Sequence, residues 1–133
     1  MSNYMHIEIN KILFKEESYA IQGAVFEVYK EIGSGFLEPI YQECLLRELN
    51  FRKIPFLAQP EMRLSYKGIL LDQVYRPDFL CYDSIMLELK ATKVLTDDFR
   101  AQLFNYLKIS KLRLGLLINF GHNPRVEIER IVL

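Results

Sequence analysis

Residues 85–91 limit the fold of this chain more than any other segment, because two charged side chains interrupt an otherwise apolar run. We expect a β-strand here, in which side chains two residues apart share a face and lie roughly 6 to 7 Å apart. Glu88 and Lys90 would then stand side by side on a stiff element, while Leu87 and Leu89 point to the opposite face. This strand should therefore have one apolar face, as a half-buried strand does.

Two amphipathic helices are predicted before the strands. Apolar residues recur at helical spacing over residues 21–32, and this helix should end at the glycine-containing break of residues 33–35. A second helical pattern covers residues 37–49, where Pro39 is tolerated because it lies in the first turn. The fold therefore begins with two helices.

Short strands follow the two helices, and a third helix separates the last two strands from the others. We expect chain reversals at residues 67–68 and 83–84, and Thr96 is a good N-cap for the third helix. The order αα-ββββ-α-ββ predicts an α/β fold with a mixed β-sheet flanked by helices. The predicted strands cover residues 62–66, 69–75, 79–82, 85–91, 112–119 and 126–133.

The length and composition predict one domain. The chain has 133 residues, of which 50% are hydrophobic and 26% charged, enough to bury one full core. We assign residues 1–133 to this domain and treat residues 1–17 as an N-terminal extension of uncertain structure.

The net charge is zero, so any binding of a polyanion requires a local patch. Residues 90–113 contain six basic and two acidic side chains. This strip fits either a phosphate backbone or a solvated helix face, and the sequence leaves both open.

We also expect a cytoplasmic protein that does not enter a membrane. The two cysteines have no metal-site spacing, the N-terminus has charges where a signal peptide is apolar, and no apolar run approaches the ~20 residues of a membrane span.

A second carboxylate precedes the charged strand by ten residues. Asp78 follows Pro77 at the start of the preceding strand, so Asp78, Glu88 and Lys90 are expected in one place. Two carboxylates and a lysine are what metal-assisted phosphodiester hydrolysis requires, namely oxygen ligands for Mg²⁺ or Mn²⁺ and a cation near the attacking water. A surface ion pair between Glu88 and Lys90 is the alternative.

These residues resemble a known signature. Pro77-Asp78, nine intervening residues and then Glu88-Leu89-Lys90 resemble the PD-(D/E)XK nuclease motif, and the order of elements resembles the restriction-endonuclease-like core of that superfamily. The run Gly35-Phe36-Leu37-Glu38-Pro39-Ile40-Tyr41 is similar to the motif of the GxxExxY protein family. Residues 88–91, 101–108 and 115–121 resemble later blocks of that family, so the resemblance covers roughly residues 18–133.

The resemblance implies roles for particular residues. It assigns Asp78 and Glu88 as metal ligands and Lys90 as the residue that positions the nucleophilic water. It also implies that Glu38 is a further catalytic acid and metal ligand, although a charge that complements the start of a helix is the alternative. Tyr41 lies one turn later and either faces the same cleft or belongs to the core.

Gln102 and Tyr106 are four residues apart and so share one face of the third helix. The resemblance implies that they orient the lysine or contact the substrate. Packing of helix against sheet is the alternative role for both.

The predicted function is a Mg²⁺-dependent nuclease that acts on nucleic acid, DNA rather than RNA. The alternative is a catalytically silent module that binds nucleic acid or protein on the same scaffold. The superfamily also suggests a two-fold homodimer, in which two metal sites would act on two strands.

This chemistry makes a geometric prediction about the hairpin that contains Asp78 and Glu88. A two-residue turn at residues 83–84 would put the two carboxylates on opposite faces, whereas a three-residue loop at residues 82–84 pairs Cys81 with Ile85 and sets Asp78 directly across from Glu88. The chemistry therefore predicts the three-residue loop, against the simplest assignment of the turn.

Overall fold

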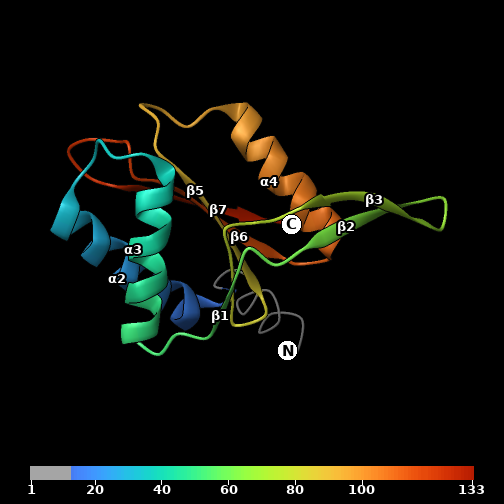
Figure 1. Cartoon of the computed structure of the whole chain (residues 1–133), viewed down its shortest axis with the longest axis horizontal. Helices are drawn as coiled ribbons and strands as arrows, with labels where there is room; N and C mark the ends of the chain where they lie inside the picture. The colour runs from blue at the N-terminus through green and yellow to red at the C-terminus, as the bar shows by residue number, and fades with distance from the viewer. Residues whose placement is uncertain (1–12) are drawn as a thin grey trace, which may run out of the picture.

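A five-stranded mixed sheet forms the centre of the computed structural model, which describes residues 13–133 (Figure 1). The strand order is β1-β4-β5-β6-β7, and only the pairing of β5 with β6 is parallel. The strands are β1 (Phe56–Ala58), β4 (Phe79–Cys81), β5 (Ile85–Lys90), β6 (Leu114–Asn119) and β7 (Glu127–Val132). The mixed sheet flanked by helices is thus confirmed and is consistent with a restriction-endonuclease-like fold.

The helices cover the two faces of this sheet. Helices α2 (Lys15–Ile32) and α3 (Glu38–Phe51) pack on one face, and α4 (Asp97–Ser110) packs on the other (Figure 1). The side chains of β5 alternate accordingly, because Leu87 and Leu89 enter the core under α2 and α3, whereas Met86 packs with residues of α4. All three helices were predicted from the sequence.

The ends of the helices follow ordinary capping chemistry. The Thr96 hydroxyl accepts a hydrogen bond from the Phe99 N–H at 3.3 Å, which confirms Thr96 as the N-cap of α4. Helix α2 ends at Gly33, whose φ of 69° lies in the left-handed region. Helix α2 begins at Lys15, so the last three residues of the expected extension are helical, and residues 1–12 lie outside the described part.

A second sheet of two strands, β2 (Met62–Tyr66) and β3 (Ile69–Tyr75), extends away from the main sheet (Figure 1). We call residues 62–75 the arm. The two-residue turn at Lys67 and Gly68 is confirmed, since both have positive φ, 50° and 79°. The expectation that these strands join the mixed sheet is wrong, because they form a separate sheet. Most of their side chains are exposed as a result. The order αα-ββββ-α-ββ also lacked β1.

The β4–β5 hairpin turns through three residues. Cys81 pairs with Ile85, and the Ser84 N–H donates to the Cys81 carbonyl at 3.0 Å. Tyr82 and Asp83 both adopt the left-handed conformation, with φ of 56° and 54°, which Asp tolerates better than most residues. The three-residue loop is therefore confirmed, and the simpler turn at residues 83–84 is wrong.

Among residues 13–133, every helix is too short or too polar to cross a membrane.

Candidate active site

Asp78 and Glu88 face each other across the β4–β5 hairpin. Phe79 pairs with Leu87, so the next position outward sets Asp78 opposite Glu88. The Asp78 Oδ2 accepts a hydrogen bond from the Leu89 N–H at 2.7 Å, which holds its carboxylate against β5 beside Glu88. The Asp78 carbonyl in turn accepts from the Gln59 N–H at 3.1 Å. The fold therefore fixes the first carboxylate next to the second.

The Glu88 carboxyl is buried without a full set of partners. Its Oε1 is inaccessible to solvent and has no hydrogen-bond partner among the described residues. The pKa of Glu88 is raised to about 8, chiefly by burial and secondly by the nearby Asp78 charge, while the charge of Lys90 opposes this shift. A buried carboxyl oxygen without a partner is costly, so this site favours either a bound proton or a bound cation.

The pKa of Asp78 is also raised. Burial is the main cause, the Leu89 N–H lowers the pKa, and the charge of Glu38 raises it. Two carboxyl groups with raised pKa values thus share one face of the hairpin. A divalent cation between them would reverse both shifts.

Lys90 lies on the same face as Glu88, two residues along β5. Its Nζ is 4.5 Å from the centroid of the Phe99 ring on α4, a cation–π distance. Among residues 13–133, no salt bridge involves Lys90. The ammonium group is therefore not paired with either carboxyl group, although its charge lowers the pKa values of both Asp78 and Glu88.

Asn119 fixes the backbone that follows Lys90, a role the sequence did not suggest. Its side chain is fully buried, and its Oδ1 accepts from the Thr92 and Gly121 N–H groups at 3.1 and 3.0 Å. The Phe120 N–H donates to the Lys90 carbonyl at 2.8 Å. A Cβ at Gly121 would lie 2.4 Å from backbone atoms of Thr92, so the two segments are in close contact. A polar residue at the end of the apolar run 114–118 was the only signal for this role.

Glu38 begins α3 and is exposed, as both of its predicted roles allow. Its charge raises the pKa values of Asp78 and Glu88, so it lies on the same side of the molecule. Within residues 13–133, however, no three acidic, histidine or cysteine side chains are close enough together to hold one metal ion. The three-carboxylate set is thus not assembled here, and Glu38 as a ligand stays a prediction.

Tyr41 belongs to the core. It is fully buried, and its ring stacks on Phe120 with a centroid distance of 4.4 Å. Its hydroxyl donates to the Gly33 carbonyl at 2.6 Å and accepts from the Phe36 N–H at 3.3 Å. Direct contact of Tyr41 with a substrate is thereby excluded, because no atom of its side chain is accessible. It instead anchors the loop that leads to Glu38.

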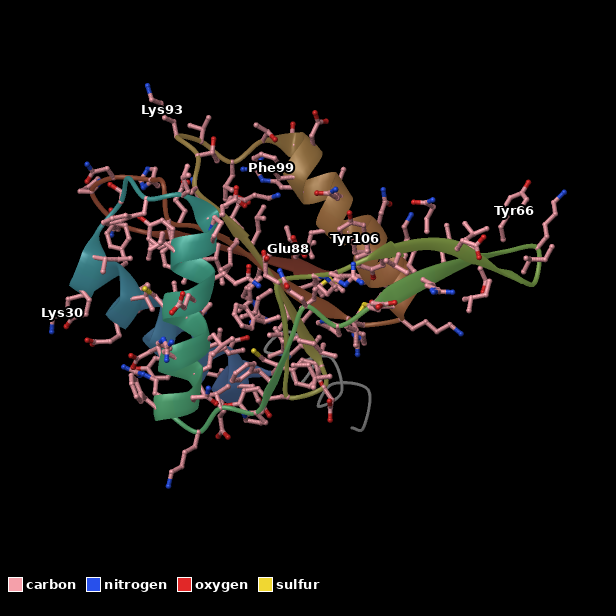
Figure 2. All side chains as sticks on the ribbon, viewed as in Figure 1. Lys30, Tyr66, Glu88, Lys93, Phe99 and Tyr106 are labelled. Atoms are coloured by element: carbon pink, nitrogen blue, oxygen red, sulfur yellow. The ribbon has the colours of Figure 1, made fainter. Side chains whose placement is uncertain are left out.

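Tyr106 lies on the side of α4 that faces Glu88 (Figure 2), and Gln102, one turn earlier, shares that side. The Gln102 Nε2 donates to the Tyr106 hydroxyl at 2.9 Å, and the Glu88 charge adds to the burial that raises the pKa of Tyr106. Among the described residues, no hydrogen bond joins either side chain to Lys90. Their position therefore fits contact with a substrate better than orientation of the lysine.

Tyr75, at the end of the arm, completes this group. Its ring stacks on that of Tyr106 with a centroid distance of 4.0 Å, and its hydroxyl donates to the Tyr106 carbonyl at 3.1 Å. The sequence carried no signal for this contact, because Tyr75 and Tyr106 are 31 residues apart.

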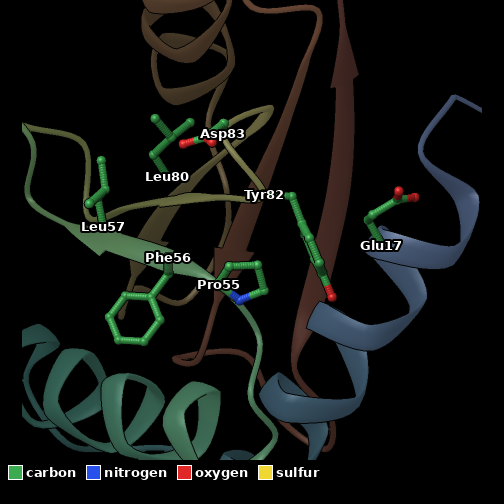
Figure 3. A pocket seen from close by; sticks show the side chains of 7 residues that line it. All are labelled: Glu17, Pro55, Phe56, Leu57, Leu80, Tyr82 and Asp83. Carbon is green, nitrogen blue, oxygen red and sulfur yellow. The ribbon is translucent and has the colours of Figure 1, made fainter.

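A separate hollow lies at the turn end of the β4–β5 hairpin, beside the first turns of α2 (Figure 3). It is lined by Glu17, Pro55, Phe56, Leu57, Leu80, Tyr82 and Asp83. None of the predicted site residues lines this hollow, so it is not part of the candidate site.

The residues at the site fit a hard divalent cation. Carboxylate oxygens are the ligands that Mg²⁺ and Mn²⁺ prefer, and the free Oε1 of Glu88 is an unused donor of that type. Two carboxylates fill only part of the coordination shell, so water and phosphate oxygens would have to complete it.

Comparison with known proteins agrees with this geometry. The family model described as "PD-(D/E)XK nuclease superfamily" matches residues 15–131. A solved structure titled "Crystal structure of SSO0001" superimposes with a TM-score of 0.53 at 22% identity. That match covers 71% of this chain and 48% of the other, so this chain spans about half the length of the solved one, and the likeness concerns the fold alone. A search of curated proteins gives no match.

Proposed function

Since this chain belongs to the PD-(D/E)XK nuclease superfamily, we propose that it is a Mg²⁺-dependent nuclease that hydrolyses phosphodiester bonds of DNA. The observation that carries the proposal is the apposition of Asp78 and Glu88, with the buried Oε1 of Glu88 left without a partner. Such a pair has a clear chemical use when a cation binds between its members and none as an ordinary structural contact.

Asp78 and Glu88 would hold the divalent cation. When bound, it supplies positive charge to the scissile phosphate and to the attacking water. The raised pKa keeps the Glu88 carboxyl largely protonated near neutral pH. This proton must leave before both oxygens of the carboxylate can act as metal ligands. Uptake of the cation should therefore release a proton.

Lys90 would position the attacking water and stabilise charge that develops on the phosphate. Its ammonium group projects from the face that carries Glu88, and the Phe99 ring holds it in place by a cation–π contact. Asn119 supports this geometry by fixing the backbone immediately after Lys90. Lys90 is thus the catalytic residue, and Asn119 is a positioning residue.

The metal site is tested by calorimetric titration of the full chain with Mn²⁺ and Mg²⁺. We expect weak binding in the wild type and none in the Asp78→Ala, Glu88→Ala double variant. Glu43→Ala is a matched control, since Glu43 is an exposed acid on α3 whose side chain pairs only with Arg47. Equal metal affinity in the wild type and the double variant would remove the site.

Cleavage is tested on single-stranded, duplex and branched DNA and on RNA of the same sequence. Hydrolysis of DNA that requires Mg²⁺ and is lost in Lys90→Ala supports the proposal. Binding without hydrolysis of any of these substrates would favour the catalytically silent binding module. The exposed apolar side chains of the arm are the observation that supports this alternative. Sedimentation of the wild type tests the expected homodimer.

A further inference from the structure

The arm exposes large apolar side chains far from the main sheet. Tyr66 is 60% exposed and Ile69 is 66% exposed, and Leu64 and Leu70 are also exposed. A two-stranded hairpin is only marginally stable by itself in water, and exposed apolar side chains at its tip add little to folding. Such side chains therefore indicate a surface that binds a partner.

A groove joins the arm to the second half of α4. It is lined by Leu64 from the arm and by Asn105, Lys108 and Ile109 from α4. Tyr106 belongs to this part of α4 and stacks on Tyr75 of the arm, with Glu88 nearby (Figure 2). The groove and the candidate active site therefore lie along the same helix.

The charges beside the groove are mostly positive and unpaired. Five basic side chains on the arm and at the end of α4 have no salt bridge among residues 13–133, namely Arg63, Lys67, Lys108, Lys111 and Arg113. Asp72 is the one acidic residue in the same two segments, residues 62–75 and 104–113. This surface therefore favours a polyanion.

Aromatic rings accompany two of these cations. The Lys67 Nζ lies 5.6 Å from the centroid of the Tyr66 ring, and the Lys108 Nζ lies 5.5 Å from that of Phe104. A ring beside an ammonium group matches one nucleotide, because the ring can stack on the base while the ammonium group contacts the phosphate.

We propose that the arm and the second half of α4 bind a single-stranded segment of the nucleic acid on which the active site acts. The inference rests on the proposed nuclease function and names the form of its substrate. Single-stranded nucleic acid is favoured because exposed rings stack on bases only where the bases are unpaired and unstacked. A second copy of the chain fits less well, because pairing this whole surface with its copy would bring ten basic and only two acidic side chains into one interface.

The length of the arm sets the reach of this contact. Residues 69–75 span about 20 Å at ~3.3 Å per residue, which is at most roughly six nucleotides at the ~3.4 Å spacing of stacked bases and fewer where the bases are unstacked. Since Tyr75 lies beside the candidate site, the arm would contact nucleotides up to about six positions from the scissile bond.

The test is fluorescence anisotropy with the full chain, in EDTA so that no cleavage occurs. The probes are labelled (dT)20 and a labelled 20-base-pair duplex. We expect the wild type to bind the single strand more tightly than the duplex. The Tyr66→Ser, Lys67→Ser variant should bind the single strand about tenfold more weakly than the wild type does, because each base stacked on an aromatic ring contributes ~1–3 kcal/mol. Tyr19→Ser, Lys30→Ser is the matched control, since both side chains are exposed and belong to α2, a helix that lies away from the arm (Figure 1).

A second measurement separates a phosphate contact from a change in folding. The Lys67→Ser, Lys108→Ser variant should reduce the slope of log K against log [salt] by about 1.4, since each phosphate contact on a single strand contributes ~0.7. Salt slopes and affinities for (dT)20 that are unaltered in both the Tyr66→Ser, Lys67→Ser variant and the Lys67→Ser, Lys108→Ser variant would overturn the inference. A dimer in the wild type that the Tyr66→Ser, Lys67→Ser variant dissociates would also overturn it.

The inference and the proposed function fail in different ways. Arm-dependent binding of (dT)20 without Mg²⁺-dependent cleavage leaves the arm assignment intact and removes the nuclease. Cleavage of DNA that arm variants do not alter removes the arm assignment and leaves the nuclease.

Discussion

The two β-hairpins of this chain have opposite relations to their surroundings. The β4–β5 hairpin lies between β1 and β6, so one face enters the core and the other carries Asp78, Glu88 and Lys90. Among the described residues, no other strand flanks the arm, and most of its side chains are exposed. The difference shows that the neighbours of a hairpin, more than its own sequence, decide what its polar groups experience. Burial raises the pKa of Glu88, whereas charges on the arm stay available to a partner.

Free strand edges are a hazard, and the arm limits it in recognised ways. Arg63 and Lys67 place charges along it, and the pairing of β2 with β3 shifts between Arg63 and Ser65. The β4–β5 hairpin needs no such devices, because both of its edges are paired. The arm is therefore built to stay unpaired with other strands while remaining exposed.

The largest expected effect contrasts the cores of the two hairpins. Phe79 is fully buried and meets Phe56 edge to face, so Phe79→Ala should lower the free energy of unfolding by about 3–5 kcal/mol. Ile69→Ala at the tip of the arm should change it by less than about 0.5 kcal/mol. Urea unfolding followed by circular dichroism measures both. Similar losses at the two positions would mean that the arm is packed as tightly as the sheet.

The next effect concerns catalysis. Glu88→Gln should lower the rate of Mg²⁺-dependent cleavage by about 100-fold or more, because the amide keeps the shape of the side chain but removes a charged ligand. Leu70→Ser, on the arm, should leave the rate constant at saturating substrate unchanged. A rate within threefold of the wild type in Glu88→Gln would contradict the assignment of Glu88.

The sequence predicted the apposition of Asp78 and Glu88, but not the environment that surrounds them. Strand alternation and the need for both carboxylates on one face required the three-residue loop at Tyr82, Asp83 and Ser84, which the structure contains. The burial of the Glu88 carboxyl arises only in the folded chain, in which helices pack on both faces of the sheet. No local pattern reports how those helices close over β5.

Other features escaped prediction for different physical reasons. Strand β1 has only three residues, between Pro55 and Pro60, which is too short for alternation to be visible. Alternation in the arm indicated strands correctly but carried no information about which strands they pair with. Tyr75 reaches Tyr106, and Asn119 reaches Thr92, through contacts that only the folded chain creates.

The third effect is a pH dependence of stability that only the buried hairpin should show. The pKa of Glu88 is raised from 4.5 to about 8, so the folded state holds a proton that the unfolded state has lost in this interval. Its contribution to stability is complete below pH 4.5 and is lost as the pH rises towards 8. Relative to Glu88→Gln, the wild type should lose up to about 1.4 kcal/mol per pH unit between these values.

Urea unfolding in EDTA at pH 5, 6, 7 and 8 measures this difference. Glu43→Gln is the control for replacing a carboxyl by an amide, because Glu43 is exposed on α3. Parallel curves for wild type and Glu88→Gln would show that Glu88 is charged in the folded protein. The outcome also bears on function, since a variant that is more stable at pH 8 but inactive would show that the site is maintained at a cost in stability.

The smallest expected effect is at Tyr106 of α4, which connects the arm to the side of the helix that faces the candidate site. Its ring stacks on Tyr75 at the end of the arm, and its hydroxyl accepts a hydrogen bond from Gln102 on the side of α4 that faces Glu88. Tyr106→Phe keeps the stacking and removes only the hydroxyl, so stability should change little. If the hydroxyl contacts the substrate, KM should rise up to about fivefold with kcat unchanged, because one hydrogen bond contributes about 1 kcal/mol. A fall in kcat with KM unchanged would instead mean that Tyr106 acts through Lys90. Tyr75→Phe is the control, because it keeps the stacked ring and removes only the hydrogen bond from the Tyr75 hydroxyl to the Tyr106 carbonyl. An equal effect in Tyr75→Phe would mean that both variants loosen the contact between the arm and α4.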